Sequence, residues 1–393
     1  MLQEQNKWWI QTRIWFRRIH LWLGLASSLV LTVVMGTGAI YVFKDEVIDL
    51  LNADVVKVSH LAEESLLTHE EIIQHIEKVT GGNVGFISLP DNEQRAWSIN
   101  IRKADEKGKG TNYYVNPYNG DYFSQKELRG YDFFFTVFKL HRWLLLDPAI
   151  GRPITGWSTI ILSFLVITGL VIWLPKKVRF WYYGLKMTWQ GDWKVFSANF
   201  HKTFGFYASF FILLMALTGP QWSFPWYRTG LYKALNVPMP VRGQPTNNVE
   251  ANSTDFQQYL EDGFQPKSIA QLLSLVDLSL PYKGSYRFSL AKDDEATIHF
   301  IKAKSGFAAS SGTDKIELDR ITGKVVELEL FSDKPFNEKI ASSIKAIHLG
   351  EVFGLFSKII FFISSLIATA LPFTGVVMWI ERLARRRKRA AKN

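Results

Sequence analysis

Four long apolar segments limit what this chain of 393 residues can fold into. They are Leu21–Phe43, Ile154–Leu174, Phe204–Trp222 and Leu355–Ile380, and each is close to or above the ~20 residues that a helix needs to cross a bilayer. Lys358 is the one clear charge among them, and it lies near an end, where a lysine can reach the membrane surface. Four such segments with so few charges predict a membrane protein and not a soluble protein with buried helices.

The positive charge of the chain is concentrated in three stretches beside these segments. The stretches before the first segment, between the second and third, and after the fourth carry 17 basic and 3 acidic residues, whereas the rest carries 29 basic and 33 acidic residues. Because basic residues next to membrane spans stay in the cytoplasm, we expect both termini inside and residues 44–153 and 223–354 outside. The expected partner of the basic tail is therefore the lipid bilayer with its anionic lipids, and not nucleic acid.

The chain contains no cysteine, and this restricts its metal chemistry. Disulfide frameworks, cysteine zinc sites, iron–sulfur clusters and covalently attached c-type haem are excluded. Any metal centre must use histidine, carboxylate or methionine ligands.

A threonine–glycine pair recurs towards the end of each apolar segment, and a histidine precedes each pair at a matched distance. His20 and His201 precede their threonines by the same number of positions, and the longer spacings from His141 and His348 to theirs differ by a single position. Four matches in the same order indicate two copies of one unit, a span, an outer domain and a second span. The four pairs are Thr37-Gly38, Thr168-Gly169, Thr218-Gly219 and Thr374-Gly375.

The two outer stretches repeat as well. Residues 111–122 and 314–325 both read as a strand, a tight turn at Gly120 or Gly323, and a second strand. Each outer stretch is expected to form a small α+β domain, and copies in the same orientation are related by a pseudo-two-fold axis along the membrane normal. The preceding elements also match, with alternating runs at 96–102 and 297–302 and helical patterns at 68–79 and 268–276.

The predicted fold is therefore a membrane protein with an α-helical core of four transmembrane (TM) helices and two outer α+β domains. The expected boundaries are a cytoplasmic N-terminus at 1–20, TM1 at 21–43, outer domain 1 at 44–135, a histidine segment with TM2 at 136–175, a cytoplasmic loop at 176–200, TM3 at 201–222, outer domain 2 at 223–338, a histidine segment with TM4 at 339–380, and a basic cytoplasmic tail at 381–393.

The four histidines beside the spans are the candidates for a cofactor site. The pseudo-two-fold axis relates His20 to His201 and His141 to His348, so that each pair can meet near one membrane face. Paired imidazoles in an apolar helix bundle are typical of b-type haem held by two axial histidines. A transition metal carried for transport is the alternative, although the spans hold no carboxylate well inside, which a transporter would usually carry. The other four histidines, His60, His69, His75 and His299, are expected to be surface groups.

Glycines share the helix faces of the first and third of these histidines. Gly38 and Gly219 follow them by about five full helical turns, and Gly24 and Gly205 follow them by about one turn. We expect these glycines to leave room for a porphyrin, with one haem at each end of the face. Close packing of helices through small residues is the competing explanation.

The histidine segments resemble a known family. Residues 17–24 (RRIHLWLG), 139–143 (KLHRW), 199–205 (NFHKTFG) and 347–350 (IHLG), together with the four threonine–glycine pairs, resemble the PepSY-associated transmembrane family. This family includes iron-uptake membrane proteins and ferric-siderophore reductases of Gram-negative inner membranes. The resemblance covers nearly the whole chain and implies a di-haem four-helix core with two PepSY-like periplasmic domains. It implies that the four histidines are the axial ligands of two haem b groups, with His20/His201 as the inner pair and His141/His348 as the outer pair.

The resemblance further implies an enzyme, a haem-dependent ferric-chelate (ferrisiderophore) reductase that passes electrons outward to siderophore-bound iron. Some larger relatives carry a fused flavin reductase domain. This chain has no G-x-G-x-x-G on a strand–turn–helix, so we expect no flavin or nicotinamide site in it and a separate electron donor. Two alternatives stay open: a haem oxidoreductase linked to a quinone or a periplasmic protein, and a non-enzymatic sensor or assembly factor.

Basic and aromatic residues near the outer histidine pair are candidates for binding a bulky anionic or aromatic ferric chelate. The same residue types are common at membrane interfaces, which is the competing explanation. The candidates are Arg142, Trp143, Arg152, Trp222, Trp226, Tyr227 and Arg228.

Overall fold

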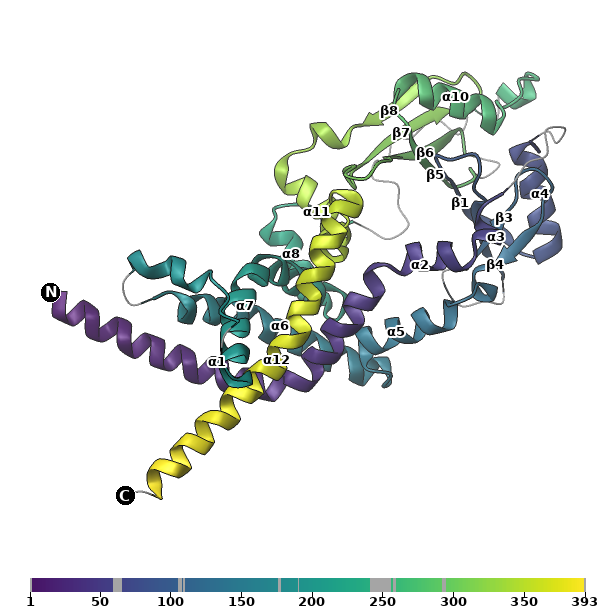
Figure 1. Cartoon of the computed structure of the whole chain (residues 1–393). Helices are drawn as coiled ribbons and strands as arrows, with labels where there is room; N and C mark the ends of the chain where they lie inside the picture. The colour runs from purple at the N-terminus through teal and green to yellow at the C-terminus, as the bar shows by residue number, and fades with distance from the viewer. Residues whose placement is uncertain are drawn as a thin grey trace. The chain divides into compact units, whose positions relative to one another are not determined.

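The computed structural model describes two compact units (Figure 1). The helical unit comprises Met1–Phe43, Phe134–Asn236 and Ile344–Asn393, and the sheet unit comprises Lys44–Phe133 and Val237–Ser343. The residues that the structure describes are 2–58, 66–104, 108, 110–175, 178–189, 191–240, 256, 259–291 and 295–391.

Four long helices form the helical unit, and each is long and apolar enough to cross a membrane. The four predicted spans are thus confirmed as apolar helices. They are α1 (Leu2–Val42), α6 (Pro148–Trp173), α7 (Trp193–Thr218) and α12 (Gly354–Ala390). Three of them extend well beyond the apolar segments at the basic ends, because lysine and arginine are good helix formers even where hydropathy no longer marks a span.

The four helices pack as a bundle in which α1 and α7 each contact α6 and α12. Apolar side chains from all four helices fill the interior of the bundle, among them Leu31, Leu162, Ile212 and Phe361. Lys358 also lies inside this bundle. It is only 6% exposed and its Nζ lies 3.6 Å from an oxygen of Glu351, so it is paired within the protein and does not reach out to the membrane surface as the sequence suggested.

Shorter helices precede or follow the spans, and the first residues of α5 and of α11 belong to the sheet unit. α5 (Tyr131–Trp143) leads into α6, and α11 (Phe336–Leu349) leads into α12. After α7, the short 3-10 turn η3 (Gly219–Trp222) leads into α8 (Pro225–Ala234). A further 3-10 segment, η2 (Val178–Gly184), lies between α6 and α7.

The sheet unit contains one antiparallel sheet of eight strands in the order β4-β3-β2-β1-β5-β6-β7-β8. Both outer stretches of the chain contribute four strands, and β1 pairs with β5 through Ile87 opposite Phe288. From the sequence, we expect each stretch to form a separate domain, whereas this pairing joins them in one sheet. The strands are β1 (Asn83–Leu89), β2 (Trp97–Arg102), β3 (Thr111–Val115), β4 (Tyr122–Ser124), β5 (Gly284–Phe288), β6 (Thr297–Lys304), β7 (Thr313–Asp319) and β8 (Val325–Glu329).

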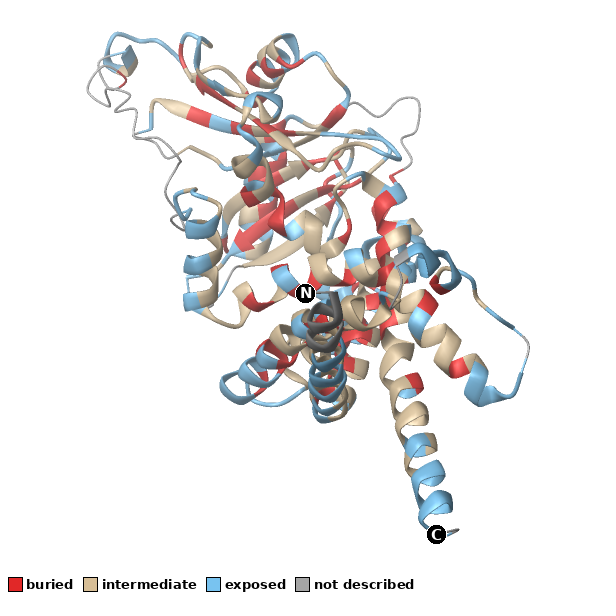
Figure 2. Ribbon diagram, turned by 90° about the vertical axis from the view of Figure 1, so that its left-hand side faces the viewer, coloured by how far each residue is buried: buried red, intermediate tan, exposed pale blue. Residues whose placement is uncertain are grey.

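Two helices, α4 (His69–Thr80) and α10 (Ile269–Ser279), cover one face of the sheet and share a core with it. Both start with a capping box, formed by Thr68 with Glu71 and by Ser268 with Gln271, which satisfies the first free N–H groups of each helix. Figure 2 shows the buried residues along the strands. The short helices α2 (Lys44–Leu51) and α3 (Ala53–Val56) precede this layer, and the 3-10 turns η1 (Gln125–Glu127) and η4 (Phe331–Asp333) follow β4 and β8.

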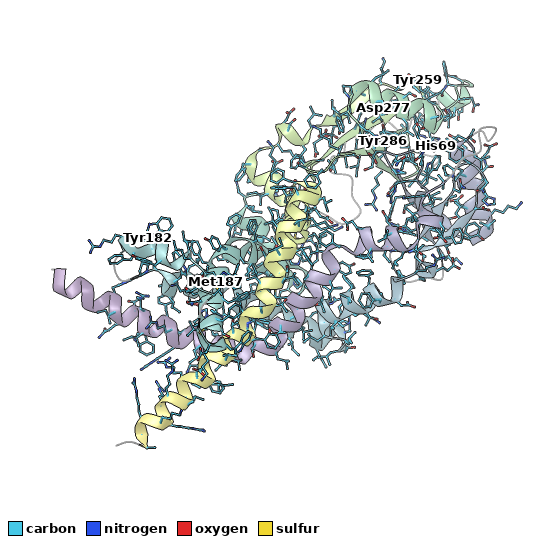
Figure 3. All side chains as sticks on the ribbon, viewed as in Figure 1. His69, Tyr182, Met187, Tyr259, Asp277 and Tyr286 are labelled. Atoms are coloured by element: carbon cyan, nitrogen blue, oxygen red, sulfur yellow. The ribbon has the colours of Figure 1, made fainter. Side chains whose placement is uncertain are left out.

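Several polar side chains of the sheet unit are buried, and His69 and Lys302 are two of them. His69 is 8% exposed and its ring stacks on Trp97 at 4.6 Å between centroids, so the expectation of a surface histidine is wrong at this position; His60 lies outside the described residues. Lys302 is 1% exposed, and its Nζ donates to Asp277 at 2.6 Å. The hydroxyl of Tyr286 on β5 donates to the same carboxylate on α10 (Figure 3).

The core of the sheet gives a first testable prediction. Phe300 is fully buried, so Phe300→Ala leaves a cavity, and we expect it to lower the free energy of unfolding by about 3–5 kcal/mol. Hydrogen exchange of the full-length protein in detergent should show lost protection in β5, β6 and β7. Phe307→Ala is the control because Phe307 is 60% exposed, and its effect should stay within about 0.5 kcal/mol. Equal effects of the two changes would contradict this core.

Candidate functional site

The four histidines of the helical unit form two pairs. The ring centroids of His20 on α1 and His201 on α7 lie 6.2 Å apart, with an angle of 80° between the ring planes. Those of His141 on α5 and His348 on α11 lie 6.4 Å apart, at 61°. Both pairs join residues far apart in the sequence, and they are the two pairs that the internal repeat predicts.

The two pairs lie at opposite ends of the helix bundle. His20 is on α1 itself, whereas His141 contacts the same helix at Thr37, several turns further along. At about 1.5 Å per residue, the two positions are about 25 Å apart along the helix. The apolar core around Leu31 and Ile212 occupies the length of bundle between them.

Each histidine directs Nδ1 at the threonine of a threonine–glycine pair on another helix. The Nδ1–Oγ1 distances are 2.9 Å from His20 to Thr168, 3.3 Å from His141 to Thr37, 2.9 Å from His201 to Thr374 and 3.0 Å from His348 to Thr218. All four threonines are buried. The contacts fall into two equivalent groups of helices. In the first, α1 provides a histidine to α6 and a threonine to α5; in the second, α7 provides a histidine to α12 and a threonine to α11.

These contacts fix the tautomer of the rings. Each threonine hydroxyl has a carbonyl of its own helix to which it donates its proton, so its oxygen is left to accept. Nδ1 of His141 also lies 2.8 Å from the carbonyl oxygen of Val34, and a carbonyl can only accept. Nδ1 of His201 and of His348 meet carbonyls of Leu371 and Met215 in the same way. Nδ1 therefore carries the proton, and Nε2 is left as a free base.

No hydrogen bond described in the structure uses Nε2 of any of the four histidines. Burial lowers the pKa of His141 and of His348 below the ordinary imidazole value, so both rings are neutral near pH 7. A neutral imidazole with Nδ1–H held by an acceptor and Nε2 free is the form in which histidine ligates a metal.

The glycine of each threonine–glycine pair faces the same histidine as its threonine. A Cβ atom built on Gly38 would lie 3.2 Å from Cε1 of His141, and one on Gly219 would lie 3.4 Å from Cε1 of His348. Gly169 and Gly375 leave equivalent space for His20 and His201, at 3.3 Å and 3.6 Å. A larger side chain at any of the four positions would press on the edge of the ring.

From the sequence, we expect Gly38 and Gly219 to leave room for a haem at the end of the bundle away from His20 and His201. They do lie at that end, where they face the rings of His141 and His348 directly. Gly24 and Gly205 do lie beside His20 and His201, in the lining of a cavity, where a Cβ would meet Leu165 and Leu371 at ordinary packing distances.

A cavity of about 660 Å³ adjoins the His20/His201 pair, with a mainly apolar lining from α1, α6, α7 and α12. Four cationic residues contribute to the lining and no carboxylate does. On α1 the spacing explains this, because Arg13, Arg17, His20 and Gly24 follow one another at intervals of four, three and four residues and so share one face. The other two cations are Lys202 and Arg382.

The proposed substrate residues near the other pair fall into separate contacts. The ring of Trp222 packs edge-on against His348, with centroids 4.9 Å apart, and Arg142 donates to the carbonyl of Trp222. Burial, and then the neighbouring charge of Arg152, lowers the pKa of Arg142 from its ordinary value. Arg152 itself lies over the ring of Trp143 at 5.6 Å.

The remaining candidates lie on α8. Trp226 is exposed, the hydroxyl of Tyr227 donates to the carbonyl of Leu217, and Arg228 lies over the ring of Tyr232 on the same helix. Trp157, which the sequence analysis did not single out, is also exposed. The centroid of its ring lies 6.2 Å from that of Trp226. The candidates are thus distributed over α5, α6, η3 and α8.

The comparison with protein families decides the membership of this chain. The model described as the PepSY-associated TM region matches residues 17–382. The chain belongs to the PepSY-associated TM family. A search of curated proteins gives no match.

Within this PepSY-associated TM protein, the matched region contains both histidine pairs and all four threonine–glycine pairs. Sequence reasoning found the histidines and expected Gly38 and Gly219 to make space for a haem, but it used the four threonines only as markers of the repeat and of the family. Their recurrence beside the histidines was the available signal for their second role, as ring partners.

The contact of glycine with histidine is testable. Gly219→Val places a side chain 3.2 Å from Thr159 and 3.4 Å from the ring of His348, and we expect this overpacking to cost about 1–3 kcal/mol of stability. Gly230→Val is the matched control, because a Cβ at Gly230 meets nothing within 4 Å. Thermal unfolding in detergent compares the two proteins. The assigned contact is wrong if Gly219→Val is no more destabilising than Gly230→Val.

Proposed function

We propose that this PepSY-associated TM protein binds two haem b groups, one between each histidine pair, and carries electrons across a membrane to reduce iron in ferric siderophores. The observation that carries the proposal is the facing pairs of imidazoles with bound Nδ1 and free Nε2. The other supporting observations are the spacing of the rings, the size of the donor set, and the lining of the cavity.

The spacing of the rings fits an iron atom between them. A metal–imidazole bond of about 2 Å on each side puts two nitrogens about 4 Å apart, and ring centroids about 1 Å behind them are then about 6 Å apart. The observed distances are 6.2 Å and 6.4 Å. The pairs therefore have the separation that a bis-histidine site requires without movement of the helices.

The number of donors favours haem over a bare metal ion. Transition metals take four or more ligands, and two imidazoles supply only two. Among the described residues no three His, Asp or Glu side chains gather in one place. A haem brings four nitrogens of its own and needs only axial ligands from the protein.

The cavity beside His20 and His201 has the polarity of a haem pocket. A porphyrin is a flat apolar ring with two carboxylates on one edge, and the cavity is apolar with a cationic group of residues. Arg17 and Arg13 lie three and seven residues before His20 on the same face of α1. They are therefore placed to pair with the two carboxylates at the edge of a porphyrin bound to His20.

We further propose the orientation of the chain and its duplication. The charge distribution favours a bacterial (Gram-negative) inner membrane protein with both termini and the His20/His201 pair towards the cytoplasm, and the sheet unit in the periplasm. The reciprocal histidine–threonine contacts and the symmetric strand order support two copies of a unit made of a span, a PepSY-like segment and a span.

The protein's own residues have distinct tasks in this proposal. Bound haem supplies reversible one-electron chemistry at its iron. The threonines and carbonyls hold Nδ1–H and so orient each ring and raise the basicity of Nε2. The apolar core between the pairs excludes water and lowers the local dielectric. At the outer end, Arg142, Arg152 and the exposed tryptophans supply charge and flat surface for an anionic or aromatic ferric chelate, which gains one electron per iron.

Removal of one ligand tests the pairing. His348→Ala should lower the haem content from two groups to one, because the outer site loses an axial ligand while His20 and His201 are unchanged. Pyridine haemochrome assay and optical spectra of the purified protein measure this. Replacement of His75 by alanine is the control, because His75 is on α4 in the sheet unit, and it should keep both groups. Loss of both haems, or of neither, in His348→Ala would contradict the two-pair site.

The threonines give a finer test. Thr374→Val removes the acceptor of His201 Nδ1–H, and loss of such a partner typically weakens metal binding by about 10–100-fold. We expect about tenfold, because the Leu371 carbonyl remains as an acceptor. Thr369→Val is the matched control on the same helix, since the hydroxyl of Thr369 donates to the Ser365 carbonyl of its own helix. The rate at which each variant loses haem to apomyoglobin compares their affinities for haem. Similar rates of haem loss for both variants would argue against the role of Thr374.

The reaction itself is tested by stopped-flow oxidation of dithionite-reduced protein. A ferric siderophore should reoxidise the haem rapidly, and a ferrous chelator should trap one ferrous ion per electron lost. A gallium complex of the same siderophore is the control, because gallium(III) is not reduced. Equal inertness to a panel of ferric chelates would favour another acceptor, such as a quinone or a periplasmic protein.

A further inference from the structure

A second hollow lies in the helical unit, between the first turns of α7 and the last turns of α12. Its volume is about 430 Å³. Five cations and one carboxylate contribute to its lining, namely Lys194, Arg382, Arg385, Arg386, Arg389 and Glu381. The proposed function assigns no ligand to this hollow.

The single carboxylate does not balance the charge. Glu381 holds Lys194 with one oxygen, at 3.0 Å, and Arg385 with the other, at 3.4 Å. No carboxylate among the described side chains lies within ion-pair distance of the other three cations, Arg382, Arg386 and Arg389. These three follow one another by four and three residues, so they share one face of α12, where like charges repel.

The general preference for positive charge at the cytoplasmic side explains why α12 ends in basic residues. It does not explain why three unpaired guanidinium groups line one hollow with a lysine from another helix. Arg387 and Lys388, in the same tail, do not line it. The arrangement is therefore more specific than the overall charge of the tail.

This hollow adjoins the cavity of the His20/His201 pair. Ala198, Met378 and Arg382 line both. A ligand held by the arginines would thus lie at the mouth of the proposed inner haem site, and its apolar part could continue over Ala198 and Met378.

We propose that this hollow binds a phosphate group of an anionic ligand. Several planar guanidinium groups around one space match the several oxygens of a phosphate, which each guanidinium can hold with two hydrogen bonds. The volume suits a phosphate with part of the molecule that carries it. The phosphate belongs either to the head group of an anionic phospholipid or to a soluble phosphate ester.

The test uses full-length protein with its haem, and two variants with the same loss of charge. Arg386→Gln with Arg389→Gln removes two cations of the hollow, and Arg387→Gln with Lys388→Gln removes two of the same tail outside it. Calorimetry with inorganic pyrophosphate tests the soluble source. Native mass spectrometry from nanodiscs of phosphatidylcholine, with or without phosphatidylglycerol, tests the lipid source by counting retained phosphatidylglycerol.

We expect one of the two probes to bind wild-type protein, and the first variant to weaken it at least about tenfold, since each removed group makes a charge-assisted hydrogen bond. The second variant should stay within about twofold. Equal losses in both variants, or no binding of either probe to wild-type protein, overturn the proposal. Haem content is measured in the same samples, so that a failure of this site is distinguished from a failure of the haem assignment.

Discussion

The hydrogen bond between histidine Nδ1 and a threonine on another helix is the interaction on which the rest of this site depends. Each of the four bonds joins two helices, and no hydrogen bond among the described residues engages Nε2 of these rings. An imidazole N–H left without an acceptor inside an apolar bundle is costly, so the bonds help to set the register of the helices. The same contacts that hold the bundle together therefore leave the rings in the form that the proposed haem ligation requires.

The two histidine pairs have the same kind of hydrogen-bond partner, a buried threonine for each ring, but different surroundings. The His20/His201 pair adjoins a mainly apolar cavity with four cationic residues in its lining, whereas the ring of Trp222 packs directly on His348. Two haems in these sites are expected to differ in potential and in spectrum, because axial ligation is equal and the local charge and exposure are not. In the proposed function, such a difference would give electron transfer across the membrane a direction.

Much of the fold could be predicted from local patterns. Hydropathy located the spans, and the positive φ angles of Gly120 and Gly323 bear out the two tight turns. The pairing of β1 with β5 could not be predicted, because no strand was expected at 83–89 or at 284–288 and because the two strands belong to different outer stretches of the chain. The direct contact of Gly38 and Gly219 with the rings of His141 and His348 could not be predicted for a related reason: the periodicity of one helix does not reveal which ring a neighbouring helix places against it.

The most direct test of the central claim is the haem content and electron paramagnetic resonance of the purified, oxidised wild-type protein. The account predicts two non-covalent haem b groups per chain, both six-coordinate and low-spin, with two resolvable signals. A protein that stays colourless after reconstitution with haem, or that holds one high-spin haem per chain, would contradict it.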